Sequence, residues 1–425
     1  MYVADSRANT PGAPASADGA VRPSAGRRRA VVAPTVLALG TVSLVTDVSS
    51  EMVTAVLPLY LVTGLGLSPL GFGLLDGIYN GFSALVRLAG GHLADRGGGR
   101  HKWVAGFGYG VSALCKPLLL VAHSLTPIGL ILAADRTGKG LRTAPRDALI
   151  SLSSTPETRG RAFGVHRAMD TAGALLGPLV AFLILRATVD GYDAVFTVSF
   201  CVAVFGVLVL VLFVPGGRRE TEAGEDDARP TLRAAVGLLG RRDLRRITVC
   251  ALLLGLATVS DSFVYLLLQR RLGVPDRWFA LLPLGTAAAF LLLAVPLGRL
   301  ADRVGRWAVF LAGHGALLVA YALLLTSWHG AALPYLVLAL HGGFYAATDG
   351  VLMAAASQGV PEALRSSGLV IVQTGQALAR FACSLLFGAA WTVWGDRAAL
   401  AGAVVALASC AAFSLTLRPE GTVTA

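Results

Sequence analysis

Long apolar stretches recur along the whole chain, and they constrain its fold more than any other feature of the sequence. About 20 helical residues cross a hydrocarbon core of about 30 Å. Hydrophobic residues make up 55% of the chain and charged residues only 14%, and this excess needs lipid to face. The sequence therefore predicts an all-α polytopic membrane protein. The longest stretches are Val31 to Thr46, Leu114 to Ala134, Phe196 to Val214, Ile247 to Leu268, Phe279 to Val295, Val309 to Ser327 and Ala398 to Leu417.

Glycine, proline and clustered charges divide the chain into about twelve predicted transmembrane helices. We expect a first set near 34–62, 69–95, 102–122, 126–152, 161–186 and 192–214, and a second set near 246–271, 277–300, 306–327, 332–357, 365–392 and 396–417. The predicted units are a disordered cytoplasmic N-terminal tail (1–33), a six-helix bundle (34–214), a charged cytoplasmic linker (215–245) with a surface helix near 231–243, a second six-helix bundle (246–418) and a short cytoplasmic tail (419–425).

The net charge of +11 is spread unevenly between the two sides of the predicted membrane span. The N-terminal tail and the even-numbered connections hold most of the arginines, including a cluster from Arg218 to Arg246. Because cytoplasmic loops carry an excess of Lys and Arg, we expect both termini in the cytoplasm and the chain in the plasma membrane. Nucleic-acid binding is excluded, since no basic cluster accompanies a readable binding fold.

Several classes of chemistry lack a signature in the sequence. The five cysteines lie in apolar segments without a C-x-x-C pair, so we expect no disulfide framework and no metal site. The sequence shows no P-loop motif for nucleotide binding and no Ser, His and Asp residues in the order of a catalytic triad. We therefore expect no enzyme activity and no cofactor, and we expect a monomer whose partners are a small-molecule substrate, protons and the lipid bilayer.

A short motif occurs twice, about half a chain apart, in each case after the second helix of its set. Gly91-His-Leu-Ala-Asp95-Arg96 recurs as Gly298-Arg-Leu-Ala-Asp302-Arg303, and Pro156-Glu157 is matched more loosely by Pro361-Glu362. Two matched points at nearly the same offset predict a duplicated six-helix unit.

The longer pattern Gly-x-x-x-Asp-Arg-x-Gly-Arg resembles a motif of the major facilitator superfamily. The second copy matches it fully, whereas the first copy departs from it at Gly99, which Arg100 follows. An aspartate here can cap a helix and pair with an arginine across the bundle, which would make a conformational latch. The alternative is a generic basic loop closed by glycine. The predicted latch residues are Gly91, Asp95, Arg96, Arg100, Gly298, Asp302, Arg303 and Arg306.

The fourth predicted helix carries a polar stripe. Asp135-Arg136-x-Gly138-x-Gly140 resembles the family's Arg-x-Gly-x-Gly pattern, and Lys139, Arg142 and Arg146 follow Arg136 on one arc of the helix. An arginine within the membrane should face the bundle interior and find a partner. The stripe predicts an anion or proton pathway; alternatively, its outer members only form salt bridges or reach the interface.

The fifth predicted helix contains Gly164, Gly173, Gly177 and Pro178, a spacing that resembles the family's antiporter-associated motif. Glycines four residues apart permit close helix contact and proline permits a bend, so this packing motif could regulate which side opens. Plain small-residue packing is the alternative. On the same helix, His166 is expected to make a structural hydrogen bond rather than shuttle protons.

Asp47 and Glu51 stand four residues apart in the first predicted helix and so project from one face. Two carboxyl groups close together in a medium of low dielectric constant repel each other, which favours proton binding by at least one. We expect proton coupling through Asp47, Glu51 and Arg136. Alternatively, the carboxyl groups pair with cations of neighbouring helices and serve only the structure. The predicted cavity residues are Arg87, Lys116, Lys139, Asp261, Gln373, Gln376 and Arg380.

Together these patterns resemble a bacterial-type permease of the major facilitator superfamily, with motifs like those of drug/proton antiporters. The resemblance implies two pseudo-symmetric six-helix bundles around a central cavity, alternating access and proton-driven transport. We expect a secondary active transporter of a small solute, with efflux by antiport favoured. The alternatives are an uptake symporter or exchanger of an anionic metabolite, and a membrane sensor that does not transport.

Overall fold

A computed structural model of the protein describes residues 33–96, 101–155, 158–189, 191–215, 240, 242–328, 330–358 and 365–417. Every regular element within these residues is helical, which confirms the predicted all-α membrane fold. The N-terminal tail, the C-terminal tail and most of the predicted linker with its surface helix lie outside the described residues.

The helices of the first set follow the predicted boundaries closely. They are α1 (Pro34–Leu59), extended by the π-helix η1 (Tyr60–Gly64), α2 (Pro69–Arg96), α3 (His101–Val121), α4 (Leu125–Leu152), α5 (Arg159–Ala187) and α6 (Gly191–Phe213). The second set consists of α8 (Arg242–Ala257), α9 (Asp261–Leu272), α10 (Asp276–Phe279), α11 (Leu282–Val304), α12 (Arg306–Leu325), α13 (Leu333–Gln358), α14 (Arg365–Trp394) and α15 (Asp396–Thr416).

Two helices predicted as continuous are broken. The predicted helix 246–271 is interrupted at residues 258–260, and the predicted helix 277–300 is interrupted at Ala280 and Leu281. The first break falls on Thr258 to Ser260, a short and partly polar run before Asp261, and the second falls on the apolar Ala280 and Leu281. Both lie in stretches that are apolar on average, so hydropathy averaged over a helix length did not reveal them. Irregular backbone at membrane depth is tolerated where it lines a cavity, and Thr258, Val259 and Ser260 do line one.

Ten spans of the described chain are long and apolar enough to cross a membrane. The long helices α2 and α4 are not among them, because charged residues interrupt their apolar sequence. Large apolar side chains such as Phe107, Leu130 and Leu292 remain exposed on the outside of the bundle, as expected for a surface that faces lipid. The two less apolar helices therefore depend on the other helices to shield their polar side chains.

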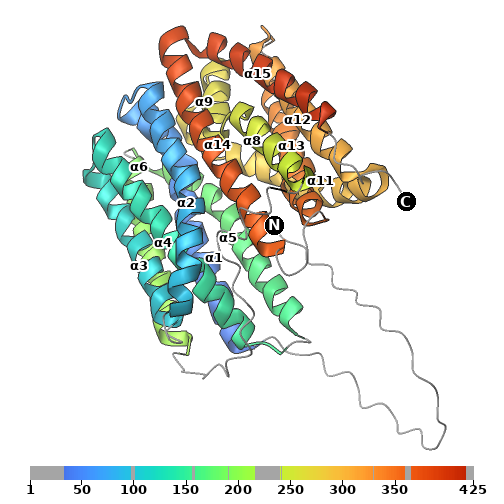
Figure 1. The fold of residues 1–425 in the computed structure, drawn as a ribbon. Helices are drawn as coiled ribbons and strands as arrows, with labels where there is room; N and C mark the ends of the chain where they lie inside the picture. Colours follow the sequence, from blue (N-terminus) through green and yellow to red (C-terminus); the bar gives the residue numbers. More distant parts are fainter. Residues whose placement is uncertain are drawn as a thin grey trace, which may run out of the picture.

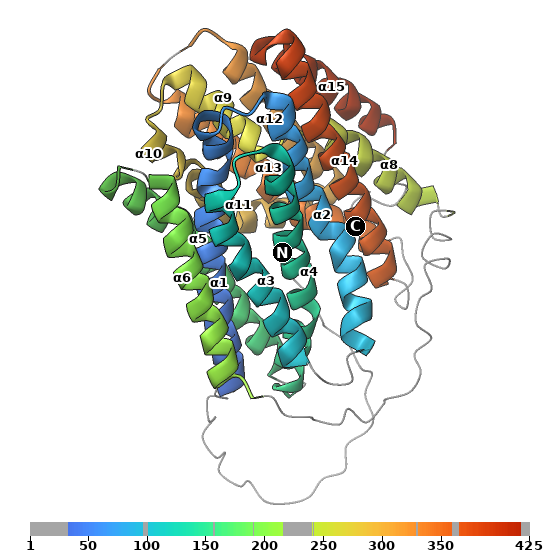
Figure 2. The ribbon, with the colours of Figure 1, turned by 90° about the vertical axis from the view of Figure 1, so that its left-hand side faces the viewer.

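The helices pack in two groups, α1–α6 and α8–α15 (Figure 1). Within the first group α1 runs beside α5 and α6, as Figure 2 also shows, and α4 packs on α2 and α3. Within the second group α13 packs on α11 and α12, and α14 packs on α8 and α15. The domain limits at 214/215 and 245/246 stay predictions, because the connection between the groups lies largely outside the described residues.

The two groups meet tightly at one end of the bundle, which we call the closed end. There the backbone N–H of Leu70 on α2 donates a hydrogen bond of 3.0 Å to Oγ1 of Thr392 on α14. The rings of Phe182 and Trp278 lie 5.0 Å apart. Close approach depends on glycine, since a Cβ atom at Gly388 would lie 2.5 Å from the carbonyl oxygen of Pro69. Aromatic and backbone contacts together seal this end.

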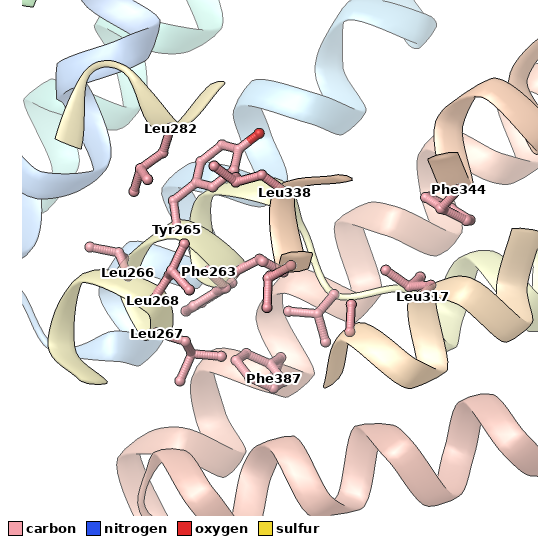
Figure 3. Packing of buried hydrophobic residues seen from close by; sticks show 14 of the residues in the cluster. Phe263, Tyr265, Leu266, Leu267, Leu268, Leu282, Leu317, Leu338, Phe344 and Phe387 are labelled. Carbon is pink, nitrogen blue, oxygen red and sulfur yellow. The ribbon is translucent and has the colours of Figure 1, made fainter. Parts of the chain in front are cut away.

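A buried apolar cluster supports the closed end from the second group (Figure 3). Phe263 on α9 lies 4.8 Å from the ring of Phe72 on α2 and 4.9 Å from the ring of Phe387 on α14, both in edge-to-face geometry. The adjacent leucines 266 to 268 are buried as well. Edge-to-face aromatic pairs contribute about 0.5–1.5 kcal/mol beyond area burial, so this cluster favours closure.

The glycines of α5 differ in their packing. A Cβ atom at Gly177 would lie 2.6 Å from Cβ of Glu51 and 2.9 Å from the carbonyl oxygen of Val48, and Gly173 lies equally close to the backbone of α1 at Leu44. Pro178 is buried beside them. Gly164 in contrast faces open space, so only the inner glycines of the predicted packing motif bring α5 against α1.

Substitution at these glycines should therefore have opposite effects. Gly177→Ala forces α1 and α5 apart and is expected to lower the free energy of unfolding by about 1–3 kcal/mol. Gly164→Ala meets no neighbour and should raise it by up to about 1 kcal/mol through helix propensity. Thermal unfolding of both purified variants in the same detergent measures this difference, and equal shifts would contradict the packing described for α5.

Candidate substrate cavity and charge network

A cavity of about 370 Å³ lies between the two groups of helices. Its lining comes from α1, α2, the break at residues 258–260, α9, α10, α11, α13 and α14. The residues are Glu51, Thr54, Ala55, Pro58, Tyr79, Asn80, Thr258, Val259, Ser260, Asp261, Ser262, Tyr265, Phe279, Pro283, Thr286, Ala287, Phe290, Tyr345, Asp349 and Arg380. A space of this size, with apolar walls and a few polar groups, suits a small organic molecule.

The charged groups of the lining are mainly acidic. Among its described residues are three carboxyl groups, those of Glu51, Asp261 and Asp349, and one cation, Arg380. Five aromatic rings complete the walls, from Tyr79, Tyr265, Phe279, Phe290 and Tyr345. The predicted cavity residues Asp261 and Arg380 are thus in the lining, whereas Lys116, Lys139, Gln373 and Gln376 are not.

Those four side chains make contacts elsewhere. Lys116 is buried inside the first group, with Nζ 3.6 Å from Oδ1 of Asp135. Lys139 Nζ approaches Oε1 of Glu51 at 4.0 Å. Gln373 contacts the sulfur of Met353 at 3.7 Å, and Gln376 lines a separate small pocket. Spacing along a helix predicted which of these groups share a face, but not which face borders the cavity. The side chain of Arg87 lies outside the described part of the protein.

The cations of α4 are all paired. Arg142 lies 3.4 Å from Oδ1 of Asp47, and Arg146 lies 3.0 Å from Asp147 and 3.7 Å from Asp170. Together with the pairs of Lys116, Lys139 and Arg136, these contacts balance each cation of the stripe with a carboxyl group. Every cation of the stripe therefore has a carboxyl partner inside the first group.

Arg136 is held in this network by two hydrogen bonds and by a contact with an aromatic ring. Its Nε and Nη2 atoms donate to Oδ2 of Asp135 at 3.1 and 2.6 Å, and its guanidinium lies 3.8 Å from the centre of the Tyr79 ring. The hydroxyl of Tyr79 forms a hydrogen bond of 2.5 Å with Thr54 on α1. Since Tyr79 and Thr54 both line the cavity, Arg136 contacts the cavity wall from behind.

Asp47 and Glu51 face α4, as their spacing on one face of α1 allows. They interact with Arg142 and Lys139, which is the ion-pair alternative considered from the sequence. The two sites differ in access, because Glu51 lines the cavity and Asp47 does not. Below Asp47, Ser43 is hydrogen-bonded to His166 at 3.0 Å, so this histidine makes a buried structural contact.

In the second group, Asp261 begins α9 directly after the helix break. The hydroxyl of Tyr345 donates to its Oδ1 atom at 2.5 Å, and Nε2 of His341 lies 3.3 Å from the same atom. Arg380 on α14 interacts electrostatically with Tyr345, Asp261 and Asp349. These side chains form the polar wall of the cavity opposite Glu51.

The second copy of the predicted latch forms the turn between α11 and α12. Gly305 has a φ of 98°, a conformation that favours glycine, and Arg306 lies 3.4 Å from Asp302 one helical turn away. This ion pair is local instead of reaching across the bundle, and Gly298 faces open space rather than a neighbouring helix. The surroundings of Gly91, the side chains of Asp95 and Arg96, and all of Arg100 lie outside the described part of the protein, as do Pro156, Glu157, Pro361 and Glu362.

One buried carboxyl group was not singled out from the sequence. Asp76 on α2 is only 5% exposed and lies where the two groups meet, with Oδ2 accepting a hydrogen bond of 2.6 Å from the hydroxyl of Ser384 on α14. A signal was present, since an acidic residue inside an apolar helix is expensive in a membrane. Its flanking glycines, Gly73 and Gly77, pack against α14 as well.

Comparisons with known proteins agree with this architecture. Residues 39–384 match the Major Facilitator Superfamily. The chain is 29% identical over 381 residues to the Uncharacterized MFS-type transporter MJ1317 of Methanocaldococcus jannaschii, covering 87% of this chain and 92% of that one. It is 33% identical over 174 residues, 41% of each chain, to the Uncharacterized protein Rv2265 of Mycobacterium tuberculosis.

Two solved structures share the fold. A crystal structure of the nucleoside transporter NupG superposes with a TM-score of 0.77 at 13% identity, over 90% of this chain and 98% of that one. A bacterial homolog of the human lysosomal transporter Spinster, in an inward-facing and unoccupied conformation, gives a TM-score of 0.73 at 15% identity, over 90% and 96%.

The fold and the central cavity thus define a polytopic membrane transporter rather than an enzyme. The chain belongs to the Major Facilitator Superfamily, whose members carry small-molecule substrates across membranes. The resemblance found in its motifs is confirmed.

The charge network predicts unequal costs for removing its acids. Asp135→Ala leaves Arg136 and Lys116 buried without their counter-charge and should destabilise the protein by about 3–5 kcal/mol. Asp147→Ala breaks a pair whose acid is 43% exposed and should cost only about 0–1 kcal/mol. Unfolding of both variants in matched lipid nanodiscs checks the ranking, and a small cost for Asp135→Ala would show that Arg136 is stabilised by other groups.

Proposed function

We propose that the protein is a proton-coupled secondary transporter that exports a small organic solute by antiport. The observation that carries this proposal is the cavity between two helix groups that meet at one end, with Glu51 in its wall and the ion pairs of α1 and α4 directly behind. Alternating access requires a binding space at such an interface and contacts that can break on one side at a time.

Coupling in this proposal runs through Asp47, Glu51 and Arg136. Protonation of Glu51 would release Lys139 from its 4.0 Å contact, and protonation of Asp47 would release Arg142. A released cation must find another partner, because an unpaired charge at membrane depth is costly. Arg136 holds Tyr79 in the cavity wall, so rearrangement of the pairs of α4 changes the space that a solute occupies.

The proposed orientation follows the charge distribution. With both termini in the cytoplasm of a cell whose plasma membrane holds the protein, the closed end faces outward, because α1 runs from the N-terminal side to that end. Asp302, Arg303 and Arg306 then lie at the cytoplasmic surface. In this proposal the local pair of Arg306 and Asp302 exchanges partners as the conformation changes, and the first copy of the motif is its counterpart in the other half. We propose that a monomer carries out the cycle.

Arg380 supports a second candidate, uptake or exchange of an anionic metabolite. It lines the cavity and could bind a carboxylate or phosphate group. The three carboxyl groups of the same lining repel an anion. The cations of α4, which indicated an anionic substrate in the sequence, are paired with acids. Efflux of a solute that is neutral or carries a positive charge therefore fits the cavity better.

Antiport can be tested in everted membrane vesicles energised by respiration, with a dye that reports the acidity of the lumen. A transported solute should raise the lumenal pH in vesicles with the wild-type protein. The response should be lost with the Asp47→Asn, Glu51→Gln double variant, which cannot exchange protons on α1. Asp193→Asn, at an exposed position at the start of α6, is the matched control and should respond like wild type. No response to a broad panel that includes anions would overturn antiport.

The role of Arg136 gives a separate expectation. Arg136→Ala removes both hydrogen bonds to Asp135 and the contact with Tyr79, so transport should be abolished. Arg136→Lys keeps the charge but not the paired geometry and should retain only a small fraction of the rate. Rates are compared at equal amounts of membrane-inserted protein; wild-type transport by Arg136→Ala would exclude Arg136 from the mechanism.

A further inference from the structure

Asp76 differs from the other buried acids of the protein. Two carboxyl side chains of the described chain are almost fully buried, and one of them, Asp135, forms ion pairs with Arg136 and Lys116. Asp76 at 5% forms no ion pair within the described residues, and its carboxyl group is met by the hydroxyl of Ser384. An ionised carboxylate buried without a counter-charge costs several kcal/mol, so a bound proton is the less costly state in this conformation.

The groups around Asp76 are acidic or neutral. The segment 260–262 contributes the hydroxyls of Ser260 and Ser262 and the carboxyl of Asp261, and α14 contributes Ser384 and the thiol of Cys383. Thr54 and Leu57 of α1, Leu61 of η1, Leu132 of α4 and Tyr79 of α2 itself complete these surroundings. Arg380 of α14 lies one helical turn from Ser384 and interacts with Asp261 and Asp349. A second carboxyl group nearby makes ionisation of Asp76 still less favourable.

The position of Asp76 links its protonation to the conformation. It sits in the contact between α2 and α14, with the aromatic cluster of Phe72, Phe263 and Phe387 at its side. A small pocket lined by Phe72, Asp76, Tyr79 and Ser262 adjoins the main cavity, because Tyr79 and Ser262 line both. Any movement that separated α2 from α14 would remove the hydroxyl of Ser384 from this carboxyl group.

We infer that Asp76 is a second proton-binding site of the transporter. Its protonation stabilises the conformation in which the two helix groups meet at the closed end. The inference rests on the proposed proton-coupled function and adds a site on α2 to the pairs on α1. When this end is open, Asp76 exchanges its proton with the solution on that side. When it is closed, the proton can leave only toward the cavity past Ser262 and Tyr79, and the ionised group then favours opening.

Distance measurements on the full chain test this inference without knowledge of the solute. Nitroxide labels at Val189→Cys and Val393→Cys, exposed positions at the closed end in different helix groups, report closure in a background whose five cysteines are replaced by alanine. The short-distance population should rise as pH falls, by up to about tenfold in the closed-to-open ratio per pH unit for one linked proton. Asp76→Asn should hold the short distance at every pH.

Two controls separate protonation from packing. Ser384→Ala keeps the carboxyl group and should keep the pH dependence, and Asp193→Asn should behave like the labelled parent. A pH dependence that persists unchanged in Asp76→Asn, a parent without pH dependence, or closure that follows sodium instead of pH would overturn the inference. The vesicle assay reports separately on antiport, so solute-driven proton movement together with any of these outcomes would leave the proposed function standing and remove only Asp76.

Discussion

The structure depends on the pairing of charge inside the first helix group. Arg136, Arg142 and Lys139 of α4 would each be costly at membrane depth without a counter-charge. Asp135, Asp47 and Glu51 supply it, and α1, α2, α3 and α5 shield the network from lipid. Because two of these acids belong to α1 and the cations to α4, the pairs join neighbouring helices, and any change in protonation alters how those helices hold together.

The second requirement is close contact between the helix groups at one end only. Glycines let the backbones of α2 and α14 approach, and the cluster around Phe263 fills the space beside them. The break at residues 258–260 lies between this cluster and the cavity, where it brings Ser260, Asp261 and Ser262 to the interface. The same segment therefore forms part of the closed end, the cavity wall and the surroundings of Asp76.

Much of this organisation could be predicted from the sequence, because lipid imposes a simple rule on apolar length. Helix positions and family followed from hydropathy and from the repeated motif of Asp95 and Asp302. The break in the helix before Asp261 was missed, because Thr258, Ser260 and Asp261 interrupt the apolar run only briefly and the whole stretch stays apolar on average. The sequence also does not show which face of each helix borders the cavity. Lys116 and Gln373 were therefore predicted to line it, whereas Tyr79 and Tyr345 are among the residues that do. Asp76 was missed because Ser384, which donates a hydrogen bond to its carboxyl group, lies on a helix of the other group.

The central claim of this account is that a carboxyl group of α1 exchanges protons while buried in the network of α4. Infrared difference spectroscopy of the purified protein between alkaline and acid pH tests it directly, because a protonated carboxyl group has its own C=O stretching band. The account predicts a band that grows as pH falls and that loses part of its intensity in the Asp47→Asn, Glu51→Gln variant. A band of equal intensity in wild type and variant would contradict it, since the acids of α1 would then remain ionised and serve only to neutralise α4.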